Sequence, residues 1–440
     1  MVTVTTVALA MRTVLTTTAE AAGKATGFVK RKVKFTGATF TQTLVFGWLA
    51  NAEATLEELC QTAAICGVDI TPQGLDQRFT AEAAACLKQV LTAAVERVVT
   101  ADPVTIPVLQ RFNGVYLDDS STIVLPDELA EVWSGCGSQT GQGRAALKLH
   151  VRWDWLQGGL TGPFLSDGRQ NDRKSALQDQ PLPPGALRLA DLGYWSLDEL
   201  RDLGQADVFW LTRPHAQTAI FTADGSRWDL AALLQAQQAS EVELTVELGV
   251  HHRLPARLLA RRVPADLAQA RRRRVRAEAR RRGRMPTKAS LVLADWLVYV
   301  TNAPTEKLTW DEVLVVARVR WQIELLFKLW KSHNGVDKSR SAQPWRRLCE
   351  IYAKLIGVVV QHWIFLVGCW PYANRSLPKA AQTVQKHAWH LASVFGHVSQ
   401  LSEALAVVQR CLAAGCRINK SKKTPRTYQL LLALHDDSLA

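Results

Sequence analysis

The sequence predicts a mixed α/β protein in which a sheet-containing core is interrupted by a β-rich segment and flanked by helical regions. Two observations support this prediction. Residues 104–212 contain short runs with the two-residue period of strands, and the later runs alternate with helical stretches. Residues 50–99 instead carry apolar residues three and four positions apart, which is the period of a helix. Elements of both kinds in this order indicate a mixed sheet covered by helices.

The first predicted region, residues 1–103, is helical. Leu59 and Ala63 follow helical spacing, a break falls at residues 67–72, and a second helix is expected from about Leu75. Two short helices around a glycine turn are typical of a helix-turn-helix, but equally of a small bundle that makes no DNA contact. We therefore expect a helical N-terminal region that binds DNA, with a plain bundle as the alternative.

The second region, residues 104–213, reads as the first part of the core. Its clearest strand covers residues 147–153, where apolar and polar side chains alternate strictly. After a polar loop, a short apolar run at residues 186–190 predicts a strand, and a helix is expected near residues 197–203. Strand and helix then alternate, as in an α/β core.

Residues 214–301 interrupt that core with further strand-like runs, such as residues 241–248 and 291–300, and one very basic segment. Thirteen arginines lie between Arg253 and Arg284, where Asp266 and Glu278 are the only acidic residues. Such a run is as typical of a solvated face or a disordered arm as of a DNA groove contact. In either case it would bind phosphates if DNA came close.

The charge of the whole chain favours a polyanionic partner. Its 440 residues include 53 Lys and Arg against 40 Asp and Glu, which gives a formal net charge of +13. Cationic side chains that neutralise phosphates release condensed counterions from DNA, and this release drives binding.

The cysteines, the apolar stretches and the N-terminus argue against a zinc-finger protein, a membrane protein and a secreted protein. The eight cysteines are scattered without the spacing of zinc ligands, so we expect reduced thiols. The apolar stretch at residues 355–370 is too short to span a bilayer and predicts a core helix. The N-terminus lacks the basic segment of a secretory signal, so we expect a cytoplasmic protein that contacts no membrane.

Residues 316–331 carry the most informative pattern, VARVRWQIELLFKLWK. On a helix, Arg320, Glu324 and Lys331 would lie on nearly the same face, because separations of four and seven residues return to it. Neighbouring apolar side chains would pack on a core. Taken alone, this pattern is also that of an amphipathic helix with an ordinary ion pair between Arg320 and Glu324.

Acidic residues also stand where predicted strands end. The run VYLDDSSTIVLP contains the adjacent Asp118 and Asp119, and Asp191 closes the apolar run before LGYW. Taken singly, such acids are typical of turns and helix caps. Residue type cannot distinguish Asp118 from Asp119, so the two remain alternatives.

Together these segments resemble the DDE transposases of the large family named for insertion sequence four. Arg320, Glu324 and Lys331 match the spacing of that family's YREK signature, whereas Ala317 stands where the family has Tyr. The resemblance covers roughly residues 40–430. It assigns the three metal-binding and catalytic acids to Asp119, Asp191 and Glu324.

The resemblance implies a ribonuclease H-like mixed-sheet core, whose last part is residues 302–340 with the Glu helix. Residues 341–440 would form a helical C-terminal region that could provide a dimer contact. The implied enzyme is a DNA transposase that binds the ends of an insertion sequence and catalyses strand cleavage and strand transfer. Two Mg²⁺ ions, replaceable by Mn²⁺, would bind to the carboxylates, because Mg²⁺ prefers hard oxygen ligands.

The same resemblance implies several DNA contacts. Arg320, Lys331 and Arg213 would bind phosphates, and Trp296 would stack a base flipped out of the DNA end. A tryptophan on a strand is otherwise usually part of a core. The implied partners are double-stranded DNA, both terminal inverted repeats and target DNA, and a second copy of the chain in a homodimer, acting at a bacterial nucleoid.

Two alternatives to an active transposase remain. Ala317 is compatible with a catalytically impaired relative that binds transposon ends and acts as a repressor. A ribonuclease H-like nuclease would cut DNA but would not join ends, and strand transfer into a target plasmid separates it from a transposase.

Overall fold

The computed structural model describes residues 2–30, 34–137, 143–421 and 423–434. The chain divides into two compact units and passes between them several times. The first unit consists of Met1–Ile106, Asp119–Gln180 and Trp321–Tyr428, and the second of Pro107–Asp118, Pro181–Arg320 and Gln429–Ala440.

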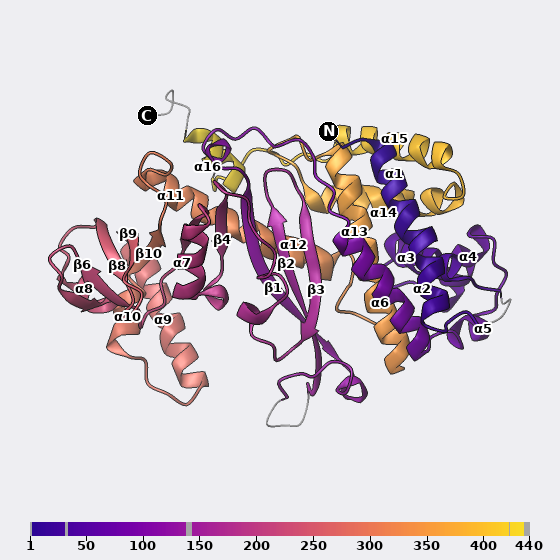
Figure 1. The fold of residues 1–440 in the computed structure, drawn as a ribbon, viewed down its shortest axis with the longest axis horizontal. Helices are drawn as coiled ribbons and strands as arrows, with labels where there is room; N and C mark the ends of the chain where they lie inside the picture. Colours follow the sequence, from indigo (N-terminus) through magenta and orange to yellow (C-terminus); the bar gives the residue numbers. More distant parts are fainter. Residues whose placement is uncertain (1, 31–33, 138–142, 422, 435–440) are drawn as a thin grey trace. The chain divides into compact units, whose positions relative to one another are not determined.

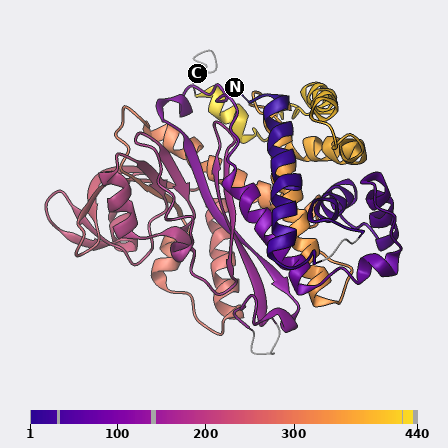
Figure 2. The ribbon, with the colours of Figure 1, turned by 45° about the vertical axis from the view of Figure 1, so that its right-hand side comes forward.

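Helices from both ends of the chain build the first unit. Helix α13 packs against α3 and α6, and α15 packs against α1, as the indigo and the orange to yellow helices show in Figures 1 and 2. The N-terminal and C-terminal helical regions therefore form one body. Its helices are α1 (Val4–Arg12), α2 (Ala19–Ala25), α3 (Gly37–Ala50), α4 (Leu56–Ile65), α5 (Pro72–Asp76), α6 (Ala81–Glu96), α12 (Trp321–Ser332), α13 (Pro344–Gly368), α14 (Leu377–Ser393) and α15 (Val398–Gly415), with the π-helical turn η1 (Thr13–Thr18) after α1.

Threonine side chains begin several of the N-terminal helices. Thr55, Thr71 and Thr80 each accept a hydrogen bond from the backbone N–H three residues later. These caps satisfy N–H groups that lack a partner within the helix. The cap at Thr80 separates α5 from α6, so the second helix of the predicted helix-turn-helix is only five residues long.

Helix α13 confirms the core helix expected from the apolar stretch. Among the described residues it is the one helix long and apolar enough to cross a membrane, so the expectation that the apolar stretch is too short was wrong. Its apolar window is nevertheless completely buried inside the protein. Its buried side chains include Tyr352, whose hydroxyl accepts a hydrogen bond from Trp133 Nε1 at 2.8 Å. This helix is therefore central to the first unit.

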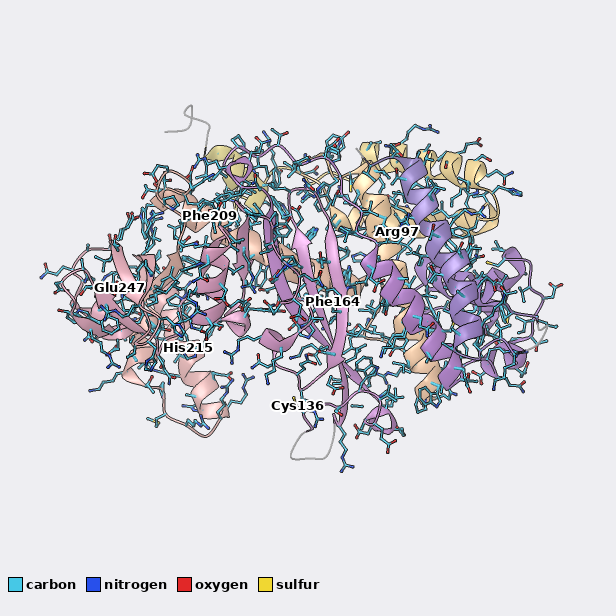
Figure 3. The ribbon with its side chains drawn as sticks, in the orientation of Figure 1. Arg97, Cys136, Phe164, Phe209, His215 and Glu247 are labelled. Carbon is cyan, nitrogen blue, oxygen red and sulfur yellow. The ribbon has the colours of Figure 1, made fainter. Side chains whose placement is uncertain are left out.

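All eight cysteines are free thiols, as the sequence predicts. Four of them are buried, whereas Cys136, labelled in Figure 3, is exposed. Burial raises the pKa of the Cys86 thiol to about 12, so that thiol stays protonated and unreactive at neutral pH.

The strands form a mixed sheet, which confirms the predicted fold class. In the first unit the order is β3-β2-β1, and in the second it is β1-β4-β5-β10-β9-β8-β6-β7, so β1 belongs to both. Strand β1 pairs with β4 in parallel, as β4 does with β5, whereas β10, β9 and β8 are antiparallel. The strands are β1 (Val115–Leu125), β2 (Ala145–Asp154), β3 (Leu160–Asp167), β4 (Leu187–Ala190), β5 (Phe209–Thr212), β6 (Ala219–Thr222), β7 (Arg227–Asp229), β8 (Glu241–Leu248), β9 (Leu254–Arg262) and β10 (Trp296–Thr301).

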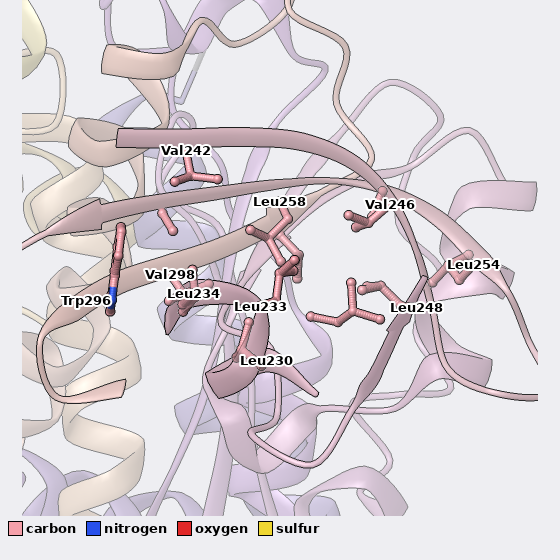
Figure 4. Packing of buried hydrophobic residues seen from close by; sticks show 14 of the residues in the cluster. Leu230, Leu233, Leu234, Val242, Val246, Leu248, Leu254, Leu258, Trp296 and Val298 are labelled. Atoms are coloured by element: carbon pink, nitrogen blue, oxygen red, sulfur yellow. The ribbon is translucent and has the colours of Figure 1, made fainter. Parts of the chain in front are cut away.

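The second unit has its own apolar core. Figure 4 shows Leu233 and Leu234 of α8 packed beside Val242, Leu258 and Trp296 of the neighbouring strands. The thirteen-arginine segment includes a regular helix, α9, and the expected strand at residues 291–300 is wrong in its first part, which lies in α10. The helices of this unit are α7 (Leu197–Gln205), α8 (Leu230–Ala236), α9 (Ala265–Arg281), α10 (Lys288–Leu293) and α11 (Trp310–Val316), and α16 (Thr427–Ala433) crosses the boundary between the units.

Candidate active site

The adjacent aspartates of β1 have different surroundings. The side chain of Asp118 is completely buried, and its Oδ2 accepts a hydrogen bond from Arg188 Nε at 2.7 Å. Arg188 on β4 is 2% exposed and also pairs with Glu199 at 2.8 Å. Successive side chains of a strand point to opposite faces, so Asp119 points away from this ion pair. Asp118 is therefore part of the packed interior of the second unit.

Asp119 instead lines a cavity of about 510 Å³ in the first unit, together with Glu324 and Lys331. Three side chains that the sequence singled out are thereby brought together, although more than 200 residues separate Asp119 from Glu324. The remaining lining residues are Ser120, Ser121, Phe327, Lys328, Ser332, Asp337 and Lys338.

Helix α12 presents Glu324 and Lys331 to this cavity because seven residues correspond to nearly two turns. Its other face is anchored by buried apolar side chains, among them Ile323 and Trp330. The ammonium of Lys331 donates a hydrogen bond to the carbonyl of Thr122 on β1 at 3.2 Å. Helix α12 and strand β1 are thus joined directly beside the cavity.

The expectation of one continuous helix over residues 316–331 is wrong. Helix α11 ends at Val316, a 3₁₀ turn covers Ala317–Arg320, and α12 begins at Trp321. Arg320 consequently lies in the 3₁₀ turn and belongs to the second unit.

Asp191 lies where the sequence predicts it, directly after the apolar strand β4. It is exposed, belongs to the second unit and precedes the 3₁₀ turn Leu192–Tyr194. In the parallel pairing of β1 with β4, Asp118 stands opposite Ala190. Asp191 is thus the first residue after β4, and Asp119 is the residue of β1 that follows Asp118.

Arg213 and Trp296 line a different cavity, of about 860 Å³, in the second unit. Arg271 and Arg274 of helix α9 line the same cavity. Burial lowers the pKa of Arg271, and the positive charge of the neighbouring Arg213 lowers it further. Trp296 is only 4% exposed and packs in the apolar core of this unit.

Several lining residues gave no clear signal in the sequence. Asp337 and Lys338 follow a turn at Gly335, which the buried Lys354 supports. The ammonium of Lys354 donates hydrogen bonds to the carbonyls of Gly335 and Lys338 at 3.0 and 2.9 Å, and pairs with Glu350 at 2.6 Å. In the sequence, the one indication of this arrangement was the spacing of Glu350 and Lys354, which lie four residues apart within an apolar helix.

The residues of the first-unit cavity suit a divalent cation and a phosphate. The carboxylates of Asp119, Glu324 and Asp337 offer hard oxygen ligands, and three lysines lie beside them. Within the described part of the chain, no group of three or more His, Cys, Asp or Glu side chains is arranged to hold a metal ion. Mg²⁺ fits such a partial set because it retains waters and binds substrate phosphate oxygens.

Comparisons with known proteins agree with this chemistry. The family described as transposase DDE domain matches residues 111–359. The chain is 27% identical over 359 residues to the transposase for insertion sequence element IS231F of Bacillus thuringiensis subsp. israelensis, covering 75% of this chain and 73% of that protein. It is 26% identical over 422 residues to the IS231C transposase of Bacillus thuringiensis subsp. berliner, covering 91% and 85%. It is 29% identical over 228 residues to the putative transposase InsL for IS186A of Escherichia coli (strain K12), covering 50% and 61%.

Proposed function

Because the chain belongs to the transposase DDE domain family, a family of metal-dependent enzymes that cleave and transfer DNA strands, we propose that it moves an insertion sequence by binding the element's ends. We propose further that strand cleavage and strand transfer proceed with two Mg²⁺ ions, which Mn²⁺ can replace. One observation carries the proposal: Asp119, Glu324 and Lys331 line the same cavity, so carboxylates and a cation stand side by side.

We propose that Asp119, Asp191 and Glu324 hold the ions. Asp119 is favoured over Asp118 because Asp118 is buried against Arg188, whereas Asp119 lines the cavity with Glu324. Asp191 is favoured by the parallel pairing of β1 with β4, in which Ala190 pairs with Asp118. Asp191 follows Ala190, just as Asp119 follows Asp118. When bound, two divalent ions would activate a water molecule and stabilise the leaving oxygen in an in-line displacement.

The cationic side chains would bind the DNA backbone. Lys331 lines the cavity, and we propose that it and Arg320 contact phosphates beside the bond that is cut, where fixed positive charge stabilises the transition state. Ala317 lacks the hydroxyl of the family's Tyr, which removes one phosphate contact but no metal ligand.

We propose a second DNA contact in the cavity of the second unit. Arg213, Arg271 and Arg274 would bind phosphates there, and their guanidinium groups suit this role because they remain charged. Stacking of a flipped base on Trp296 would require the side chains that now cover the indole to move, since it is 4% exposed.

The remaining assignments concern partners and regions. We propose that the N-terminal helices of residues 1–103 contribute to DNA binding and that residues 341–440 contribute to a homodimer assembled on DNA. The net charge of +13 supports an extended DNA contact, at the nucleoid of a bacterial cell.

Cleavage of linear DNA that carries the element's own ends tests the proposal. The parent protein should nick the ends with Mg²⁺, and Glu324→Gln should bind the ends without cutting. Glu247→Gln is a matched control, because Glu247 (Figure 3) is a partly exposed carboxylate paired with Arg253 on the second unit. This control should cleave normally.

The alternatives give different results. End binding without cleavage by the parent would support the repressor. Cleavage without joined products in the presence of a target plasmid would support the nuclease, and cleavage by Glu324→Gln would exclude Glu324 as a metal ligand.

A further inference from the structure

Strand β2 has a polar face that is buried under the loop that follows β3. His150 and Arg152 on this face are 0% and 4% exposed. Lys148 donates a hydrogen bond to the carbonyl of Gln170 at 2.6 Å, and Arg152 donates one to the carbonyl of Gln180 at 2.6 Å. Buried polar groups are costly unless they are hydrogen-bonded, so these bonds hold the loop on the strand.

Asp172 connects this loop to strand β1. Its Oδ1 accepts a hydrogen bond from the hydroxyl of Ser120 at 2.9 Å and one from the ammonium of Lys148 at 3.3 Å. His150 Nδ1 lies 3.8 Å away, but burial lowers the pKa of His150 to about 4, so its ring is neutral near pH 7. Lys148 therefore supplies positive charge to Asp172, and Asp172 in turn holds Ser120.

Ser120 is the residue that follows Asp119. Its backbone N–H donates a hydrogen bond to Asp119 Oδ1 at 2.8 Å. Ser120 is thus held at two points. Its hydroxyl donates a hydrogen bond to Asp172, and its backbone N–H donates one to the Asp119 carboxylate. The hydrogen bonds run continuously from Lys148 through Asp172 and Ser120 to Asp119.

We propose that Asp172 is a positioning residue of the active site, which orients Asp119 through Ser120 and thereby sets the affinity of the site for a divalent cation. This inference rests on the proposed function of Asp119 as a metal ligand. Residues that hold a metal ligand through hydrogen bonds fix its orientation. Their loss typically costs about 10–100-fold in metal affinity or activity. Asp172 does not line the cavity itself, so its effect is exerted through Ser120.

A purely structural role predicts a different result. If Asp172 only fastens the loop, its loss lowers the thermal stability and leaves the metal affinity of the folded protein unchanged. Metal affinity, measured at a temperature where each variant is folded, therefore distinguishes the two roles.

The experiment compares the full-length parent with Asp172→Ala, Ser120→Ala and Ser120→Thr, which keeps the hydroxyl. Asp179→Ala is the control, because Asp179 is an exposed acid of the same loop. Mn²⁺ binding is measured by electron paramagnetic resonance in the absence of DNA. The part of the signal that Asp119→Asn loses is assigned to this site. The Mg²⁺ concentration for half-maximal cleavage is measured separately.

Asp172→Ala and Ser120→Ala should each weaken Mn²⁺ binding and raise the Mg²⁺ requirement about 10-fold or more, whereas Ser120→Thr and Asp179→Ala should not. The variant that combines Asp172→Ala with Ser120→Ala should bind Mn²⁺ no more weakly than either single variant, because both substitutions break the same chain of hydrogen bonds. Unchanged Mn²⁺ binding by folded Asp172→Ala, or additive losses in the double variant, would overturn the inference.

Failure of the proposed function gives a separate result. A parent that binds Mn²⁺ through Asp119 but does not cut element ends would refute the transposase activity. The Mn²⁺ affinities of the variants would still decide the role of Asp172.

Discussion

Replacing Asp118 by Asn should destabilise the protein, although the neighbouring Asp119→Asn should mainly abolish cleavage. Asp118→Asn keeps the size of the side chain but removes its charge from beside Arg188, at a distance of 2.7 Å. Arg188 would stay buried, since it is only 2% exposed, and would keep Glu199 at 2.8 Å as a partner. Arg188 would also remain charged in this variant, because a guanidinium keeps its proton in proteins.

The expected loss follows from this geometry. Two unit charges 2.7 Å apart attract each other by about 6 kcal/mol at an effective dielectric constant of about 20, before any cost of desolvation is subtracted. Breaking a buried pair typically costs about 3–5 kcal/mol. Because Glu199 remains, we expect the lower end, about 3 kcal/mol, which corresponds to a decrease in Tm of roughly 6–12 °C for a unit of this size.

Thermal and urea unfolding of the two single variants measure this difference. Asp119→Asn should change the free energy of unfolding by less than about 0.5–1 kcal/mol, because Asp119 is half-buried beside an open cavity. Asp118→Asn should retain metal-dependent cleavage at a temperature where it is folded. An inactive but fully stable Asp118→Asn, together with an active Asp119→Asn, would refute the reasoning and exchange the roles of the two aspartates.

Two further measurements test charge in other parts of the molecule. Burial lowers the pKa of His150 and His362 to about 4, below the ordinary value of 6.5, so the unfolded chain binds more protons between these pH values. The free energy of unfolding should therefore fall as the pH decreases from about 6.5 to 4, by up to about 3 kcal/mol for each histidine, and His362→Gln should flatten this dependence in urea melts. The double substitution Arg271→Ala with Arg274→Ala should reduce the slope of log affinity for DNA against log salt by up to about 2 in titrations from 50 to 200 mM salt. An unchanged slope would mean that these two arginines do not contact phosphates.

Local sequence patterns were sufficient for β4 and α12, whereas Asp119, which we expected where a strand ends, lies within the 11-residue strand β1. The apolar run before Asp191 predicts strand β4, and the helical spacing of Glu324 and Lys331 places both on one face of α12. Such predictions succeed because strand alternation and helical period depend on residues close in the sequence. The mixed α/β class follows from the same short-range patterns.

Other features depended on contacts between residues far apart in the sequence. Asp118 and Asp119 have the same chemistry, and only the burial of Arg188 on β4 distinguishes their environments. Likewise, Asp172 is an ordinary loop acid in the sequence, and its importance arises from Ser120, which lies 52 residues away.

The sequence by itself determined the mixed α/β class, the basic character of the chain and the residues that resemble a DDE site. Only the tertiary structure decided which aspartate faces the cavity, that the N-terminal and C-terminal helices form one body, and that Arg320 lies in a 3₁₀ turn rather than in α12. The physical reason is that a side chain's burial and hydrogen bonds are set by whatever packs against it, and those partners come from distant parts of the chain.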